Sequence, residues 1–94
     1  GGSIAIGGTR HGGQETTVAM INNFFLVNEI LPTGGPAGNY CGACVWSQDK
    51  LPKDFDDPMG VERVKGVGRR VAEVAKILKA GREIVGDSRP DWEI

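Results

Sequence analysis

The sequence of 94 residues has little of several features that mark particular classes of protein. Its two cysteines, Cys41 and Cys44, are too few for a disulfide scaffold and favour a reducing cytoplasm. No apolar run approaches the ~18 residues that a membrane helix needs. Eleven basic residues against twelve acidic ones leave no positive excess for nucleic-acid phosphates. We therefore expect a soluble cytoplasmic protein that binds neither nucleic acid nor membrane.

Glycine is the residue that the sequence has in excess. Its fifteen glycines are roughly double the usual share of about 7%, and they cluster within 1–13, 34–42 and 60–68. Such clusters between apolar segments mark tight turns or places where the backbone approaches a ligand. The chain also opens on Gly1-Gly2-Ser3 without a methionine, so we expect it to begin inside a longer polypeptide.

Residues 3–31 have the pattern of a strand, a glycine loop and a helix, which is the opening of a β–α–β unit. The β-branched run at 3–6 suits a buried strand of a parallel sheet. The helix is expected from about Gln14 to Glu29, where apolar residues recur at helical spacing. Thr16 and its neighbour Thr17 are the expected caps, because their hydroxyls can accept a backbone hydrogen bond.

Residues 32–57 form a long, turn-rich segment in which only 44–46, Cys44-Val45-Trp46, has strand character. Residues 30–31 could begin another strand, but the proline that follows them cannot donate to a ladder. A segment this long without strong periodicity is usually functional or interacting. The expected sheet therefore has two or three strands.

The clearest prediction is a terminal helix over 58–81. Asp57 is a good N-cap, and the proline after it is a good first helical residue. Valines recur at helical spacing behind it, and Gly81 is a natural stop. Gly66 and Gly68 each cost about 1 kcal/mol relative to alanine inside a helix. That cost is tolerable where the helix lies flat on a sheet.

The loop between the first strand and the first helix carries the clearest chemical signal. It is expected at the carboxyl end of the sheet, where open α/β folds bind their ligands. Glycines let backbone N–H groups approach a ligand, and a helix N-terminus favours an anion. The Lys-Ser/Thr pair of a P-loop is absent, and Arg10 breaks a Gly-x-Gly-x-x-Gly pattern. The pattern indicates a phosphate or a planar electron-rich ligand, or else a tight connection that needs glycine only for its shape.

The sequence Gly-Gly-Thr-Arg-His-Gly-Gly-Gln-Glu-Thr-Thr at 7–17 resembles the segment after the fourth strand in the NADPH-dependent FMN reductase and iron–sulfur flavoprotein families. The similarity continues through Asn-Tyr-Cys-Gly-Ala at 39–43 and through 68–74, so it covers nearly the whole chain. It implies an α/β, flavodoxin-like fold of which residues 1–94 are the C-terminal half, ending in a tail at 82–94. The family's phosphate-binding loop, second flavin loop and iron–sulfur cysteine cluster have no counterpart here.

The resemblance also implies a cofactor and a function. The loop would face the isoalloxazine ring of FMN, with NADPH or a ferredoxin-like protein as the electron donor. The implied cofactor-binding residues are Gly8, Thr9, Arg10, His11, Gly12, Gly13, Gln14 and Glu15. Arg10 would stabilise the anionic reduced flavin and so raise its potential. The implied function is an FMN-dependent oxidoreductase, a flavin reductase or an electron-transfer flavoprotein. The alternative is a non-enzymatic half-domain that docks on another polypeptide.

Other side chains have ordinary interpretations. Hydride transfer through a flavin needs no protein nucleophile, so His11 is expected to be a solvated or capping residue, and no catalytic residue is assigned. Cys41 and Cys44 form a C-x-x-C, but no second pair or histidine lies at zinc spacing, so no metal site is predicted. Arg69, Arg70 and Lys65 could contact a nucleotide phosphate, or form part of the solvated face of the terminal helix.

The expected partners follow from the small size of the sheet. Two or three strands with helices on them leave a sheet edge and an apolar face that must be covered. We expect a second copy of the chain or the missing N-terminal half to cover them. Trp46, Phe55 and Trp92 are expected in irregular segments, where they could cover a flavin or an oligomer seam.

Overall fold

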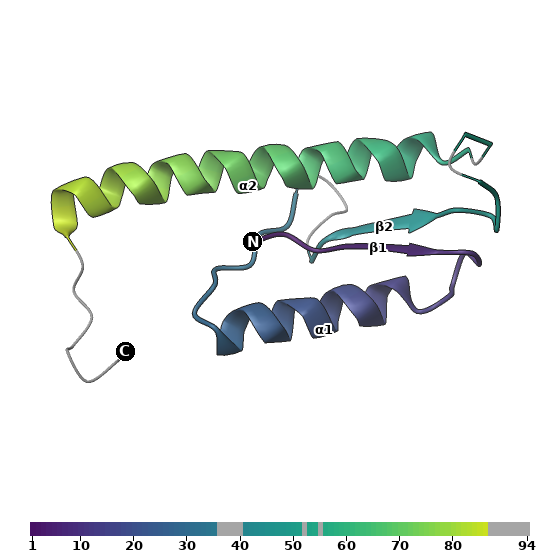
Figure 1. Ribbon diagram of the computed structural model, residues 1–94, viewed down its shortest axis with the longest axis horizontal. Coiled ribbons are helices and arrows are strands. Elements are labelled where there is room, and N and C mark those ends of the chain that lie inside the picture. The colour runs from purple at the N-terminus through teal and green to yellow at the C-terminus, as the bar shows by residue number, and fades with distance from the viewer. Residues whose placement is uncertain (36–40, 52, 55, 87–94) are drawn as a thin grey trace.

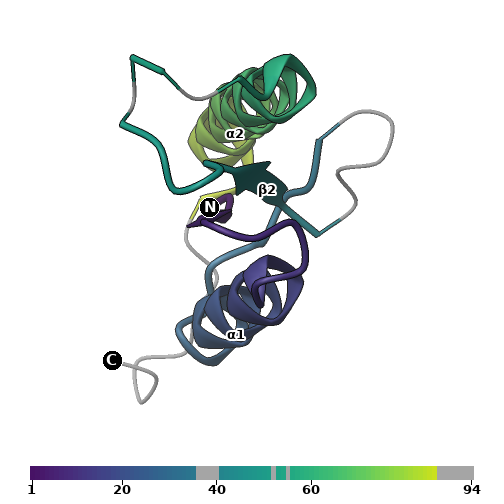
Figure 2. The ribbon, with the colours of Figure 1, turned by 90° about the vertical axis from the view of Figure 1, so that its right-hand side faces the viewer.

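A computed structural model describes residues 1–35, 41–51, 53–54 and 56–86. Its elements are β1 (Ile4–Gly7), α1 (Gln14–Val27), β2 (Ala43–Trp46) and α2 (Pro58–Val85). The strands pair in parallel, and the two helices lie on opposite faces of the sheet (Figures 1 and 2). The expected α/β fold, with a parallel sheet and two helices, is confirmed. Asn39, Tyr40, Phe55 and most of the 82–94 tail, Trp92 included, lie outside the described residues.

The sheet consists of two strands within the described residues. The register runs from Ile4 opposite Ala43 to Gly7 opposite Trp46, so both strands end at the same edge. Residues 30–32 form no strand; beyond them Thr33 makes one isolated parallel bridge to the start of the chain. The expected third strand is thus absent from the part of the chain that the structure describes.

Strand β1 is buried on one face only. Ala5 is buried, whereas Ile4 and Ile6 are 43% and 64% exposed. Facing side chains alternate along a strand, so the two isoleucines share a face that α2, which packs on β2, leaves uncovered. The sequence-based expectation of a strand buried on both faces is correct for one face.

Helix α1 begins differently from the expectation. Its N-cap is Gly13, in the left-handed region at φ 90°, and neither Thr16 nor Thr17 caps it. The Thr17 hydroxyl instead donates to the carbonyl oxygen of Gly13 at 2.9 Å. The helix ends at Val27, because Glu29 adopts φ 59° and turns the chain away. One glycine with positive φ therefore replaces the threonine cap, and the helix is two residues shorter than expected.

Helix α2 confirms the predicted start and corrects the predicted end. Asp57 caps it and Pro58 is its first residue, but the helix continues through Gly81 to Val85 and ends before Gly86. An exposed glycine costs a helix only about 1 kcal/mol, which is too little to stop a long one. After Val74 only Gly81 is partly shielded, so the last part of α2 extends beyond the sheet (Figure 1).

The two helical glycines that were expected against the sheet differ from each other. Gly66 is buried beside Val67, which is 2% exposed. Gly68 is exposed, and a Cβ there would meet nothing within 4 Å. Close packing therefore accounts for the first glycine and not for the second. Neither helix of the described residues combines the length and apolarity that crossing a membrane requires.

Candidate functional site: the loop at the carboxyl end of the sheet

The glycine loop joins the end of β1 to the start of α1. Because β1 and β2 are parallel, this loop lies at the same edge as Trp46 and the segment leading into α2 (Figure 1). Thr9, Arg10 and His11 are exposed there. The structure thus brings the predicted loop, the end of β2 and the starts of both helices to one edge of the sheet, where α/β folds hold ligands.

Gln14 fixes the shape of this loop. Its side chain is 5% exposed, its Oε1 accepts a hydrogen bond from Gly12 N at 2.8 Å, and its Nε2 donates to Thr9 O at 2.7 Å. A longer bond of 3.4 Å joins Nε2 to Val45 O on β2. The side chain points inward and both ends of its amide are occupied within the chain. Its contribution to a ligand site is therefore to hold the loop in shape.

The loop glycines meet close neighbours. A Cβ on Gly8 would overlap the carboxylate of Asp49, and a Cβ on Gly12 would lie 2.5 Å from the Thr9 hydroxyl. Gly13 needs its left-handed backbone to begin the helix. The backbone conformation thus accounts for Gly13, whereas a Cβ on Gly8 would meet only the carboxylate end of the exposed Asp49 side chain. Gly12 is exposed, and its Cβ would meet chiefly a flexible side chain.

Arg10 lies over the indole of Trp46, with its Cζ 4.8 Å from the ring centroid, which is cation–π geometry. The indole Nε1 donates a hydrogen bond to Gly8 O at 3.1 Å. Trp46 is the last residue of β2, which confirms the strand character predicted for 44–46 and corrects the expectation that Trp46 lies in an irregular segment. Sequence reasoning missed its link to Arg10, because the link depends on the parallel register that sets Trp46 opposite Gly7.

Asp57 joins this edge to α2. Its Oδ1 accepts from Gly60 N at 3.0 Å, which is the predicted cap, and its Oδ2 accepts from Trp46 N at 2.9 Å. Ser47, the residue after Trp46, donates its backbone N–H to Gly7 O at 2.9 Å. The loop after β1 and the segment after β2 are therefore cross-linked by backbone and side-chain hydrogen bonds. The Asp57–Trp46 bond had no signal in the sequence.

The cysteines lie away from the exposed loop residues. Cys41 and Cys44 are free and half-buried, and burial, followed by the charge of Glu15, raises the pKa of the Cys44 thiol. A raised pKa keeps Cys44 protonated and weakens it as a nucleophile or metal ligand. The described residues hold no group of three or more His, Cys, Asp or Glu side chains placed to bind a metal ion.

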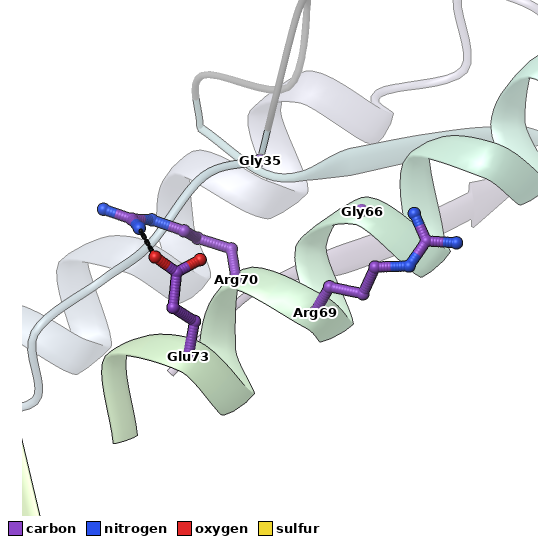
Figure 3. A pocket seen from close by; sticks show the side chains of 5 residues that line it. All are labelled: Gly35, Gly66, Arg69, Arg70 and Glu73. Atoms are coloured by element: carbon purple, nitrogen blue, oxygen red, sulfur yellow. Dashed lines mark hydrogen bonds and ion pairs between the residues drawn. The ribbon is translucent and has the colours of Figure 1, made fainter. Parts of the chain in front are cut away.

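A separate hollow of about 370 Å³ lies on α2, lined by Gly35, Gly66, Arg69, Arg70 and Glu73. Arg70 pairs with Glu73 at 2.9 Å, and Arg69 points away from that pair (Figure 3). The two arginine side chains point apart, and Glu73 neutralises the charge of Arg70, so the pair does not converge on a phosphate. This geometry favours the solvated helix face over the nucleotide-phosphate patch.

Comparison with known proteins identified curated relatives with consistent names. An iron–sulfur flavoprotein of Methanocaldococcus jannaschii is 42% identical over 82 residues, which is 84% of this chain and 41% of the relative. A second from the same organism is 40% identical over 78 residues, covering 81% and 39%. One from Archaeoglobus fulgidus is 37% identical over 80 residues, covering 84% and 41%. The chain therefore spans about two fifths of the length of these relatives. No family model and no solved structure matches the chain.

Proposed function

On the premise that this chain belongs with the iron–sulfur flavoproteins that it matches at 37–42% identity, we propose that it forms the ring-facing side of an FMN site in an oxidoreductase. The observation that carries the proposal is the exposed loop with Arg10 at the carboxyl end of the parallel sheet, directly before a helix that no side chain caps. FMN would supply the redox chemistry, accepting electrons from NAD(P)H or a reduced carrier protein and passing them on.

The residues of the loop suit the edge of an isoalloxazine ring. That edge carries carbonyl and ring-nitrogen acceptors, and it gains negative charge on reduction. Arg10 offers five N–H donors and a fixed positive charge, so it would stabilise the reduced form more than the oxidised form. The α1 N-terminus adds partial positive charge at the same edge. Gln14 holds the loop, and the exposed Gly12 permits close approach.

We further propose that FMN phosphate is held outside this chain. Phosphate contacts are charge-assisted and numerous, so they anchor a flavin more strongly than one ring-edge contact of about 1–3 kcal/mol. The 94 residues alone should therefore bind FMN weakly or not at all. Because the chain spans 41% of its M. jannaschii relative, the decisive experiment places it within the remainder of that protein, in exchange for the matching segment.

In this chimera, Arg10→Ala should lower the flavin potential more clearly than it weakens FMN binding. Gly12→Val should weaken binding, because its side chain would push on Thr9 and block approach of the ring. Arg69→Ala is the matched control, since Arg69 is an exposed arginine on α2. A redox titration and a binding titration on each variant give the result. An unchanged potential in Arg10→Ala together with normal FMN binding in Gly12→Val would show that the loop does not lie at the flavin. A colourless, stable chimera would support the non-enzymatic alternative.

The exposed apolar residues support a partner for the chain. Ile6, Phe24 and Ile84 are 64%, 62% and 87% exposed, and they lie on β1, α1 and α2 respectively. We propose that the remainder of a flavoprotein chain or a second copy covers them. Light scattering at micromolar concentration should therefore show a species heavier than 10.0 kDa. A well-folded monomer of that mass would contradict the proposal.

A further inference from the structure

We propose that Trp46 is the positioning residue for Arg10, so that its indole sets the potential of the flavin without touching it. The inference rests on the proposed FMN function and adds a residue that lies on another strand. It is carried by how Trp46 is held, by how Arg10 lies over it, and by the donors that this contact leaves available.

Trp46 is held both through its indole and through its backbone. Its ring nitrogen donates to Gly8 O at 3.1 Å, and its backbone nitrogen donates to the Asp57 carboxylate at 2.9 Å. Gly8 belongs to the loop and Asp57 to the start of α2. Neither the ring nor its backbone can rotate without breaking one of these bonds, so the ring face is a fixed surface beside the loop.

Arg10 rests on this surface and makes no ion pair in the described residues, whose ion pairs, Lys65–Glu62 and Arg70–Glu73, lie on α2. An exposed arginine side chain without such a contact would sample many rotamers. A cation–π contact draws on the positive charge of the guanidinium and does not use up its N–H donors. The charge is thereby held in one place while the donors stay available to a ring-edge acceptor.

The inference predicts that the ring face, more than the ring nitrogen, controls the potential. In the chimera, Trp46→Leu removes the face and should lower the flavin potential in the same direction as Arg10→Ala. The double variant should match Arg10→Ala alone, because the indole acts only through the guanidinium. Trp46→Phe keeps an aromatic ring face beneath Arg10, so its flavin potential should stay close to that of the parent. Arg69→Ala is again the control and should leave the potential unchanged.

The outcomes separate this inference from the function on which it rests. If Arg10→Ala shifts the potential and Trp46→Leu does not, or if their shifts add in the double variant, the positioning role is wrong and the FMN site stands. If FMN binds but neither substitution shifts the potential, or if the chimera binds no FMN, both fail.

A second measurement uses the chain itself and needs no flavin. With Trp92→Phe, Trp46 becomes the sole tryptophan of the two in the sequence. Arg10→Ala should then raise the rate at which acrylamide quenches the Trp46 fluorescence, because the guanidinium no longer covers the ring. Arg69→Ala should leave that rate unchanged. An equal quenching rate with and without Arg10 would overturn the positioning role even if a Trp46 variant failed to fold.

Discussion

The two helices begin at the same edge of the sheet, but a side chain closes one start and leaves the other open. Asp57 caps α2 and also binds the end of β2. Gly13 begins α1 with its backbone alone, and no side chain makes a cap hydrogen bond there. A closed start stabilises a helix, whereas an open one leaves its donors for a ligand. The difference supports the α1 start, rather than the α2 start, as part of the ligand site that we propose.

The helices also differ at their far ends. Helix α1 ends at Val27 beside the sheet, while α2 continues past it with exposed apolar residues such as Leu78 and Ile84 (Figure 1). A long helix that is apolar where the described chain does not cover it needs other protein there. We therefore expect the α2 start to be stabilised by this fold and its end to contact the partner proposed above.

The largest expected effect concerns the side chain that shapes the open start. Gln14→Ala removes three hydrogen bonds of a buried residue, to Gly12 N, Thr9 O and Val45 O, so unfolding should become easier by about 2–3 kcal/mol. Urea unfolding at a fixed protein concentration measures this. Glu15→Ala, at the exposed neighbour, should stay within about 0.5 kcal/mol of the parent. Equal stability of the two variants would mean that the loop does not depend on Gln14.

Substitution of Asp57 at the closed start of α2 should lower the free energy of unfolding slightly less. Asp57→Ala removes the cap on Gly60 N and the acceptor of Trp46 N, and we expect about 1–2 kcal/mol of destabilisation. Asp57→Asn keeps a capping oxygen and should retain part of the stability. The control is Asp56→Ala, since the side chain of Asp56 is exposed. If Asp56→Ala costs as much as Asp57→Ala, the α2 start is not closed by this carboxylate.

Alanine substitutions at two glycines of α2 should change the stability by smaller amounts and with opposite signs. Gly68→Ala should stabilise the chain by about 0.5–1 kcal/mol, because it adds helix propensity where a Cβ meets nothing within 4 Å. Gly60→Ala should destabilise it, since the new Cβ would overlap the Asp57 carboxylate that forms the cap. Thermal unfolding compares them. The same sign for both substitutions would contradict the packing described here.

Local signals predicted much of this architecture, and long-range contacts explain what they missed. The apolar pattern and the Asp57-Pro58 pair predicted the strand, the loop and the start of α2, because these features depend on residues that are close in the sequence. The predicted stop at Gly81 was wrong, since a glycine weakens a helix without ending it. The contact of Arg10 with Trp46 could not be predicted, because it depends on the strand register and on the shape that Gln14 gives the loop.

The smallest expected effect concerns the pKa of the Cys44 thiol, which charges on both helices influence. Burial raises the pKa of Cys44 most, the charge of Glu15 on α1 raises it further, and the charge of Arg63 on α2 lowers it. In a Cys41→Ser chain, the alkylation rate of Cys44 by iodoacetamide should therefore reach its midpoint above the ordinary thiol pKa of about 8.5. Below the ordinary thiol pKa, the Cys44 thiol keeps its proton in both the folded and the unfolded chain. Above it the unfolded chain ionises first, so stability falls as the pH rises toward the folded pKa.

The charges can be removed one at a time to test this balance. Glu15→Gln should move the alkylation midpoint of Cys44 down, and Arg63→Gln should move it up, each by less than unfolding in urea moves it down, because burial is the largest cause. Mass spectrometry of the alkylated chain across pH gives all four midpoints. A Glu15→Gln midpoint equal to that of the parent would show that the charge of Glu15 does not influence Cys44. A midpoint in the folded parent equal to that in urea would show that Cys44 is not shielded between the helices.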